Sequence, residues 1–142
     1  MSEENRVGPQ IEPFLVLTIE TRMVRTVAGT PLGDRTVFDV VRGRFEGTGL
    51  VGRIPASGGD WVTRTARGSL LDVRLLLETD DGTPILFRYS GKASLRAGQP
   101  HIEVIGSFEA PEGPYGWLND IQAFGLGTPV DEGVRYNLYR FK

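Results

Sequence analysis

Apolar and polar residues alternate along much of the chain. The clearest example is Leu70–Thr79, where one face carries Leu71, Val73, Leu75 and Leu77 and the other Asp72, Arg74, Leu76 and Glu78. Successive side chains of a strand point to opposite sides, so this alternation predicts a strand with one buried face. We find no segment of ten or more residues with the 3.6-residue apolar period of an amphipathic helix. An all-β domain is therefore predicted.

Glycine and proline divide the chain into short segments rich in β-branched and aromatic residues. The sequence contains 19 Gly and 9 Pro, and such punctuation is typical of strands joined by turns. Asp81-Gly82 predicts a hairpin turn, and the glycines of Gly43–Gly47 predict a bulge or sharp bend. The expected strands are Phe14–Val24, Arg35–Arg42, Leu50–Ile54, Trp61–Thr65, Leu70–Thr79, Pro84–Ser94, His101–Ala110, Ile121–Leu126 and Val134–Phe141.

About eight or nine strands at this spacing indicate a sandwich or a barrel. We predict a single, mostly antiparallel β-barrel, because closure hides strand edges and a barrel of about eight strands can hold one small ligand. The length of 142 residues favours one domain. We expect a flexible N-terminal tail over residues 1–12 and the barrel over residues 13–142.

The composition limits the partners and the cellular location that we expect for the protein. The net charge is −2 and basic residues form no patch, so neither nucleic acid nor an anionic membrane is an expected partner. The polar segment Met1–Gln10 does not resemble a secretory signal, and no apolar run is long enough to span a bilayer. The chain has no Cys, which excludes disulfides and fits the cytoplasmic location that we expect.

The segment Gly58–Gly82 carries the most promising chemistry. Asp60 follows two glycines and could act as an acid or base at a pocket mouth, with Trp61 as a stacking wall. The alternative is that Asp60 stabilises a glycine turn and that Trp61 only packs. Asp80 and Asp81 are interpreted as turn residues, because an Asp-Gly turn accounts for them.

Asp72 and Arg74 share one strand face. If that face lines the barrel, Arg74 can hold a ligand carboxylate or enolate oxygen while Asp72 balances its charge. If it faces water, the two form a weak exposed pair, and the aliphatic face opposite favours this arrangement. Glu46, between Gly43 and Gly47, is either a second carboxylate at the same mouth or a turn residue.

Aromatic residues supply candidate pocket walls. Tyr89 on the return strand and the loop residues Tyr115 and Trp117 have the shape and polar ends that suit a cavity or its lid. Asn119 could donate a hydrogen bond to a carbonyl oxygen, and we expect Trp117 and Asn119 to be the neighbours of Asp60 across the barrel mouth. The alternative for the loop is a segment pinned to the barrel end by its tryptophan.

Several reaction classes are excluded by what the sequence lacks. His101 is the single histidine, so a Ser-His-Asp triad is rejected and a zinc site is not expected. No glycine-rich phosphate motif opens a helix. We therefore predict neither a metal nor a cofactor.

Seven short motifs in order resemble a known family. They are Thr30–Arg35, Gly43–Gly47, Gly58–Trp61, Asp72–Arg74, Thr79–Gly82, Phe108-Glu109 and Trp117–Asn119. Together they resemble domain-of-unknown-function family 3237, from about Phe14 to Phe141. The resemblance implies a lipocalin-like or calycin-like barrel, commonly oligomeric, with no settled general activity. The chain departs from the family pattern at His101–Ile105, which lacks the usual aromatic-and-Arg strand start.

These observations predict a barrel that binds a small organic acid, carbonyl or polyketide-like compound. As an enzyme it would be a cofactor-free isomerase or cyclase in which Asp60, Asp72 or Glu46 moves a proton. Arg74 and Asn119 would stabilise negative charge. Trp61, Tyr89, Tyr115 and Trp117 would shape the cavity. The alternatives are a non-catalytic carrier or sensor, and an assembly module whose outward Asp72–Arg74 face joins subunits in a homodimer or larger oligomer.

Overall fold

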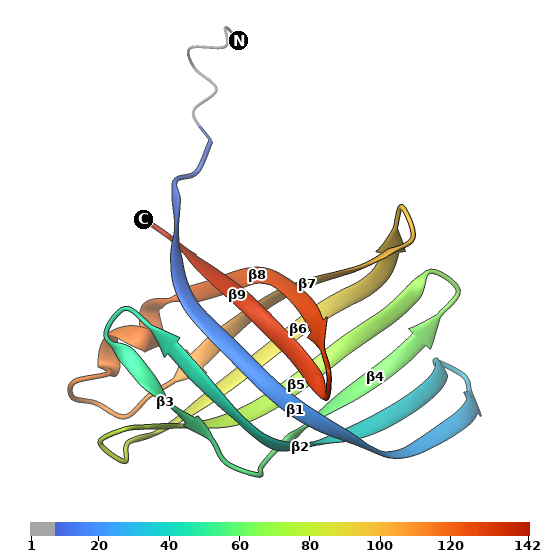
Figure 1. Cartoon of the computed structure of the whole chain (residues 1–142), viewed down its shortest axis with the longest axis horizontal. Coiled ribbons are helices and arrows are strands. Elements are labelled where there is room, and N and C mark those ends of the chain that lie inside the picture. Colours follow the sequence, from blue (N-terminus) through green and yellow to red (C-terminus); the bar gives the residue numbers. More distant parts are fainter. Residues whose placement is uncertain (1–7) are drawn as a thin grey trace, which may run out of the picture.

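A computed structural model describes residues 8–142 and confirms the all-β prediction (Figure 1). One short 3-10 helix, η2 (Gly116–Asp120), accompanies the strands. The strands are β1 (Ile11–Thr30), β2 (Gly33–Gly47), β3 (Leu50–Ile54), β4 (Gly59–Thr65), β5 (Gly68–Thr79), β6 (Pro84–Arg96), β7 (Gln99–Glu109), β8 (Gln122–Val130) and β9 (Gly133–Phe141). Among the described residues, no helix is long and apolar enough to cross a membrane.

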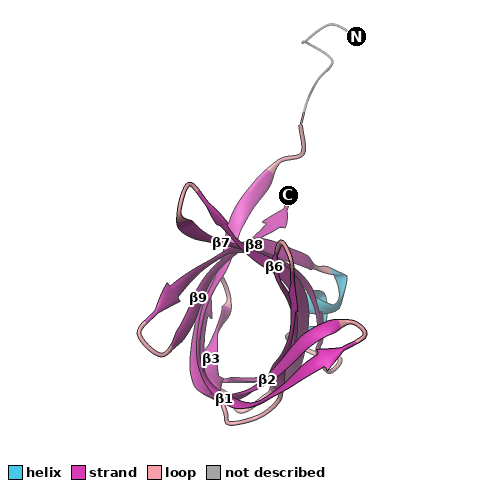
Figure 2. Cartoon of the chain, turned by 90° about the vertical axis from the view of Figure 1, so that its right-hand side faces the viewer, coloured by secondary structure: helices cyan, strands magenta, loops and turns pink. Residues whose placement is uncertain are grey.

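The nine antiparallel strands form one sheet that closes on itself (Figure 2). Strand β1 pairs with both β9 and β2, and the order β1-β9-β8-β7-β6-β5-β3-β2 returns to β1. Strands β3 and β4 occupy the same place in this ring, since each lies between β2 and β5 at a different height. The segment 55–58 joins them, and residues 40–42 of β2 and 75–77 of β5 pair with neither β3 nor β4.

Strands β1 and β2 are longer than the sequence indicated. Strand β2 continues through Gly43–Gly47, and the register shift lies nearby, where Glu20 pairs with Arg42 and Thr21 with Val40. Glycine at position 43 keeps the strands close, because a Cβ there would overlap the Thr18 carbonyl oxygen. A bend is thus absorbed within a continuous strand.

Strand β1 begins at Ile11, which pairs with Phe141, and Glu12 pairs with Arg140. Both residues belong to the segment expected as a tail. Residues 8–10 precede the strand, and there the Gln10 carbonyl oxygen accepts a hydrogen bond from the Lys142 backbone N–H (2.9 Å). Residues 1–7 lie outside the described residues.

The core fills one half of the barrel, which we call the packed half. It lies at the end formed by β3, η2 and the β5–β6 turn, on the left of Figure 1. Phe87 stacks on Phe108 with ring centroids 4.3 Å apart, and Phe14 meets Phe108 edge-on at 5.9 Å. Leu118 of η2 is fully buried and covers this end.

The other half carries the long β1–β2, β4–β5 and β6–β7 hairpins, on the right of Figure 1, and we call it the hairpin half. Its strand ends are poorly covered: Met23 is 57%, Val27 55% and Leu95 72% exposed. None of these three residues belongs to the core cluster, although Ile102 and Val104 of β7 still contribute to it. The barrel is therefore closed by packing at one end only.

Candidate functional site

Asp60 lies on the inner wall at the start of β4. It pairs with Phe38 on one side and with Val73 on the other, and Val73 is fully buried. Directly paired residues of antiparallel strands share a face, so the Asp60 side chain is on the inner face. Val73 in turn pairs with Tyr89, which places Tyr89 in the same row.

Two glycines hold Asp60 in this place. Gly58 has a φ of +65°, and a Cβ on it would overlap the Arg74 carbonyl oxygen. A Cβ on Gly59 would lie 2.6 Å from the Phe38 carbonyl oxygen. The chain therefore enters β4 in close contact with β5 and β2. Glycine permits this close approach at both positions, and it also permits the positive φ of Gly58.

The hydrogen-bonded pairing of β4 with β5 is interrupted next to Asp60, which leaves a backbone N–H group free to bind its carboxyl. The register pairs Asp60 with Val73 and then Thr63 with Leu70, with no pairing between. There the Asp72 backbone N–H donates to Asp60 Oδ1 at 3.3 Å. Burial outweighs this hydrogen bond and, with the nearby Asp72 charge, raises the pKa of Asp60 from 3.8 to about 6.

Two buried tyrosines lie beside Asp60. Tyr89 and Tyr136 are each 2% exposed, and their ring centroids are 5.2 Å apart. Burial raises the pKa of Tyr136 to about 12 and that of Tyr89 well above its usual value, and the Asp60 charge contributes to both shifts. Within residues 8–142, the Tyr89 hydroxyl has no hydrogen-bond partner of good geometry.

Each of these tyrosines packs over a glycine on the neighbouring strand. Tyr89 pairs with Gly106 and Tyr136 with Gly127. A Cβ on Gly106 would lie 2.6 Å from the Tyr89 Cβ, and one on Gly127 would lie 2.7 Å from the Tyr136 ring. The absent side chains let both rings lie across the wall, so the glycines fix where the hydroxyls point.

The cluster of Asp60, Tyr89 and Tyr136 brings together one acid and two hydroxyl groups from three separate strands. An acid with a pKa near neutrality can donate or accept a proton at ordinary pH, and hydroxyl groups can donate to an oxygen that gains charge. Sequence reasoning identified Asp60 and Tyr89 but not Tyr136. The alternation of Tyr136 with Val134 and Leu138 is a signal that it faces inward, but nothing in the neighbouring sequence indicates a polar partner.

Trp61, Asp72 and Arg74 lie on the outer wall instead. Trp61 is 58% exposed, on the face of β4 opposite to Asp60. The three residues line, with Gly58 and Gly59, an outer hollow of about 410 Å³. Asp72 and Arg74 point outward because Val73, Leu75 and Leu77 of the same strand fill the interior. Of the two orientations left open by the sequence, the structure therefore has the outward one.

The loop residues lie at the packed end. Asn119 accepts a hydrogen bond from the Ala110 backbone N–H (2.9 Å) and donates to the carbonyl oxygens of Ala110 and Gly116 (3.0 and 3.1 Å). Trp117 meets the Phe14 ring edge-on at 6.0 Å, and the Arg140 guanidinium lies 5.9 Å above it. The loop is thus pinned to the barrel end.

The expectation that Trp117 and Asn119 face Asp60 across one barrel mouth was wrong. They follow β7, whose end pairs with the start of β6, whereas Asp60 lies beside Val73 in the middle of β5. Tyr115 likewise donates to Asp81 Oδ2 (3.1 Å) in the β5–β6 turn. In that turn Asp81 accepts from the Thr79 hydroxyl and the Thr83 backbone N–H, which lowers its pKa, as expected of a turn residue.

Glu46 and His101 also lie away from the cluster. Glu46 lines an outer groove on β2. The His101 Nε2 atom is 2.8 Å from Glu103 Oε2, which the Arg96 guanidinium also contacts at 2.9 Å. Among residues 8–142, no three or more His, Cys, Asp and Glu side chains gather in a way that could hold a metal ion.

Solved structures from several organisms share this fold. A beta-barrel like protein from Acinetobacter baumannii AYE is 27% identical, with a TM-score of 0.86 over 97% of this chain and 99% of that one. A protein with unknown function from Clostridium acetobutylicum ATCC 824 is 18% identical, with a TM-score of 0.85 over 94% and 99%. An enzyme from Penicillium herquei is 21% identical, with a TM-score of 0.74 over 97% and 98%.

A search of curated proteins finds no match. The model of one protein family matches residues 9–141, nearly the whole chain. This match confirms the resemblance carried by the seven motifs. The chain belongs to the family described as protein of unknown function DUF3237.

Proposed function

We propose that the barrel binds a small carbonyl, enol or phenol compound next to Asp60 and moves a proton on it without a cofactor. The observation that carries this proposal is the inner-wall carboxyl of Asp60, whose pKa is about 6, beside the buried hydroxyl groups of Tyr89 and Tyr136. Buried acids with strongly shifted pKa values and specific polar neighbours are concentrated at functional sites.

The chemistry follows from the three groups. Near neutral pH, ionised Asp60 removes a proton from the carbon next to a carbonyl group, and the electron pair moves to the carbonyl oxygen. A tyrosine hydroxyl donates to that oxygen and stabilises the enolate. Protonated Asp60 then returns the proton to the same or another carbon, which exchanges hydrogen or isomerises the compound.

The substrate is expected to enter from the hairpin half. Only that half lacks a continuous core, and Asp60 itself is partly exposed. The packed half is closed by Leu118 and the aromatic stack. Arg74, Trp61, Trp117 and Asn119 have no part in this site, because they lie on the outer wall or at the packed end.

Support from related structures concerns the fold alone. The Penicillium herquei protein of similar fold is an enzyme, so a barrel of this shape is compatible with catalysis. The expected self-association is a separate proposal. The exposed Trp61 and Ile105 on the outer wall favour it, and light scattering at micromolar concentration tests it, since a monomer would contradict it.

The test of proton transfer uses 2-tetralone in D2O, with exchange of its α-hydrogens followed by NMR. We expect the protein to raise the exchange rate above that of buffer, and D60N to lose at least 90% of the increase. D120N is the matched control, because it makes the same change at an exposed carboxyl of η2 at the packed end and should retain the increase.

Binding is measured separately with 2-naphthol, whose hydroxyl group resembles an enol, and with 2-methoxynaphthalene, which cannot donate. Tighter binding of 2-naphthol that is lost in D60N supports the site. Binding without any exchange would reassign the protein as a carrier. No binding of 2-naphthol and no exchange would overturn the proposal.

A further inference from the structure

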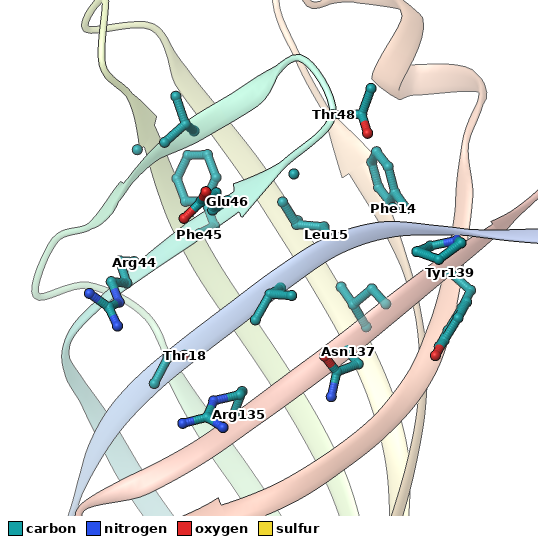
Figure 3. A pocket seen from close by; sticks show the side chains of 16 residues that line it. Phe14, Leu15, Thr18, Arg44, Phe45, Glu46, Thr48, Arg135, Asn137 and Tyr139 are labelled. Atoms are coloured by element: carbon teal, nitrogen blue, oxygen red, sulfur yellow. The ribbon is translucent and has the colours of Figure 1, made fainter.

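A second hollow lies on the outside of the barrel, on a different part of the wall. It encloses about 770 Å³ and crosses β3, β2, β1 and β9 (Figure 3). Its lining includes Thr18, Arg44, Glu46, Asn137 and Tyr139. The interior of the barrel lies on the other side of these strands, since Leu17 and Ile19 fill it on either side of Thr18.

Three residues form a polar row across this groove. Thr18 of β1 pairs with Arg44 of β2 on one side and with Arg135 of β9 on the other. Neighbouring strands are about 4.8 Å apart, so the two arginine Cα atoms are about 10 Å apart, within reach of one shared ligand. Figure 3 shows the two arginines on either side of Thr18.

Arg44 and Arg135 form no ion pair. Within residues 8–142, neither guanidinium group has a carboxylate oxygen at ion-pair distance, whereas those of five other arginines do. The five pairs are Arg22–Asp39, Arg42–Glu20, Arg53–Glu78, Arg96–Glu103 and Arg140–Glu12. Two neighbouring positive charges without ion-pair partners attract an anion from solution.

The hollow continues on both sides of the row. A second depression of about 540 Å³ also contains Thr18, Arg44 and Arg135, and it extends away from the groove toward Arg42 and the acids Glu20, Asp131 and Glu132. The short Thr18 side chain lies between the two long arginine side chains and leaves room for a ligand between them. An anion bound there would contact two planar donors and one hydroxyl group.

We propose that this row binds the phosphate group of a small phosphate monoester. A guanidinium group can donate two parallel hydrogen bonds to one anion, so two of them and the Thr18 hydroxyl match the three terminal oxygens of a phosphate better than the two oxygens of a carboxylate. Glu46 lies two residues from Arg44 on the same face, and its carboxylate disfavours a second negatively charged group on the ligand besides the phosphate. The uncharged part of the ester therefore lies toward Val16, Asn137 and Tyr139.

This site does not depend on the Asp60 site. Thr18, Arg44 and Arg135 face outward, whereas Asp60 faces the interior from β4. D60N should therefore leave phosphate-ester binding unchanged. The two proposals can fail separately, and the same variant shows which of them has failed.

The experiment titrates the protein with 1-naphthyl phosphate and follows the fluorescence of the ligand, in low salt and in 200 mM NaCl. At the higher salt concentration, exposed charges more than about 8 Å apart are largely screened from one another. The comparison ligand is 1-naphthol, which lacks the phosphate group. R44Q and R135Q should each weaken binding at least five-fold, and the double variant should show no saturation. R88Q is the matched control, because it removes one outward arginine from β6, on another part of the wall.

The outcomes decide the proposal. It is supported if 1-naphthyl phosphate binds more tightly than 1-naphthol and only the R44Q and R135Q variants weaken it. Equal weakening in R88Q, or equal binding of 1-naphthol, overturns it, because the attraction would then be one of net charge or of apolar surface. A vesicle arm with phosphatidic acid in phosphatidylcholine tests the source: sedimentation that requires both arginines, without binding of the soluble ester, would reject the small ester in favour of a lipid headgroup.

Discussion

The two halves of the barrel use the same strands for different purposes. In the packed half, inward side chains are aromatic or aliphatic and fit against one another, as Phe87 and Phe108 do. At the boundary with the hairpin half, the inner wall carries Asp60, Tyr89 and Tyr136, and beyond it the core thins. The comparison suggests that one end supplies stability while the other tolerates a buried acid that costs stability. Natural proteins break local folding rules mainly at functional sites.

The largest expected effect lies in the packed half. Replacing the buried ring in F87A should lower the free energy of unfolding by about 3–5 kcal/mol, because it removes the stack with Phe108 and leaves a cavity. F38A is the matched change beside Asp60, where the ring is half-buried, and should cost about 1–2 kcal/mol. Urea unfolding measures both, and equal losses would contradict the division of the barrel.

The next effect concerns Asp60 and pH. Its pKa in the folded state is about 6 against 3.8 ordinarily, so the folded protein binds this proton more tightly than the unfolded chain. Its contribution is fully present below pH 3.8 and is lost as the pH rises through about 6, at a cost of about 3 kcal/mol.

D60N removes this cost while keeping an oxygen that can accept from the Asp72 N–H. It should therefore be more stable than the native protein at pH 8 by about 2–3 kcal/mol, with little difference at pH 4. Thermal unfolding at the two pH values measures this. D120N, which changes an exposed carboxyl of η2 away from Asp60, should shift neither value, and a native-like pH profile in D60N would remove Asp60 as the cause.

A smaller effect is expected where tyrosine lies over glycine. G127A places a methyl group 2.7 Å from the Tyr136 ring, so the ring must move, at a cost of about 1–3 kcal/mol. The displaced hydroxyl group should also reduce the 2-tetralone exchange rate more than the loss of stability explains. G116A is the control, since its methyl group would have no neighbour nearer than 3.9 Å. Unfolding and exchange assays on both variants check this, and unchanged exchange in G127A would exclude Tyr136 from the site.

The smallest effect is expected at the packed end. Y115F removes one exposed hydrogen bond to Asp81 and should cost about 0.5–1.5 kcal/mol. It should leave 2-naphthol binding unchanged, because Tyr115 lies away from Asp60. Unfolding and binding are measured on the same sample, and a loss of binding would show that the two ends are coupled.

Much of the fold is predictable because its signals are local. Alternation in Leu70–Thr79 identified the strand and its inward aliphatic face, and the Asp81-Gly82 turn follows from residues that tolerate positive φ. The extent of β1 and β2 was not predictable. The residues of both strands near the β1–β2 turn are polar or exposed. They are extended because the two strands pair with each other, and their sequence shows no apolar alternation that would predict a strand.

The candidate site shows the same division. The two glycines before Asp60 identified it as a candidate residue. Asp72 and Arg74, its neighbours on β5, were correctly assigned to one face of that strand. The prediction that Trp117 and Asn119 lie near Asp60 was wrong, because loops with suitable residues can lie in different parts of a barrel. Sequence spacing does not say at which end a loop closes.

Most strands, the turns and the inward aliphatic face can be predicted from the sequence, since they depend on a few neighbouring residues and the two-residue period. The meeting of Asp60 of β4, Tyr89 of β6 and Tyr136 of β9 inside the ring cannot, because it arises from the three-dimensional arrangement of distant strands. That meeting depends on closure between β1 and β9, on the interrupted pairing between β4 and β5, and on glycines opposite the two tyrosines. The same closure brings Arg44 and Arg135 to either side of Thr18, although 91 positions separate them in the chain (135 − 44).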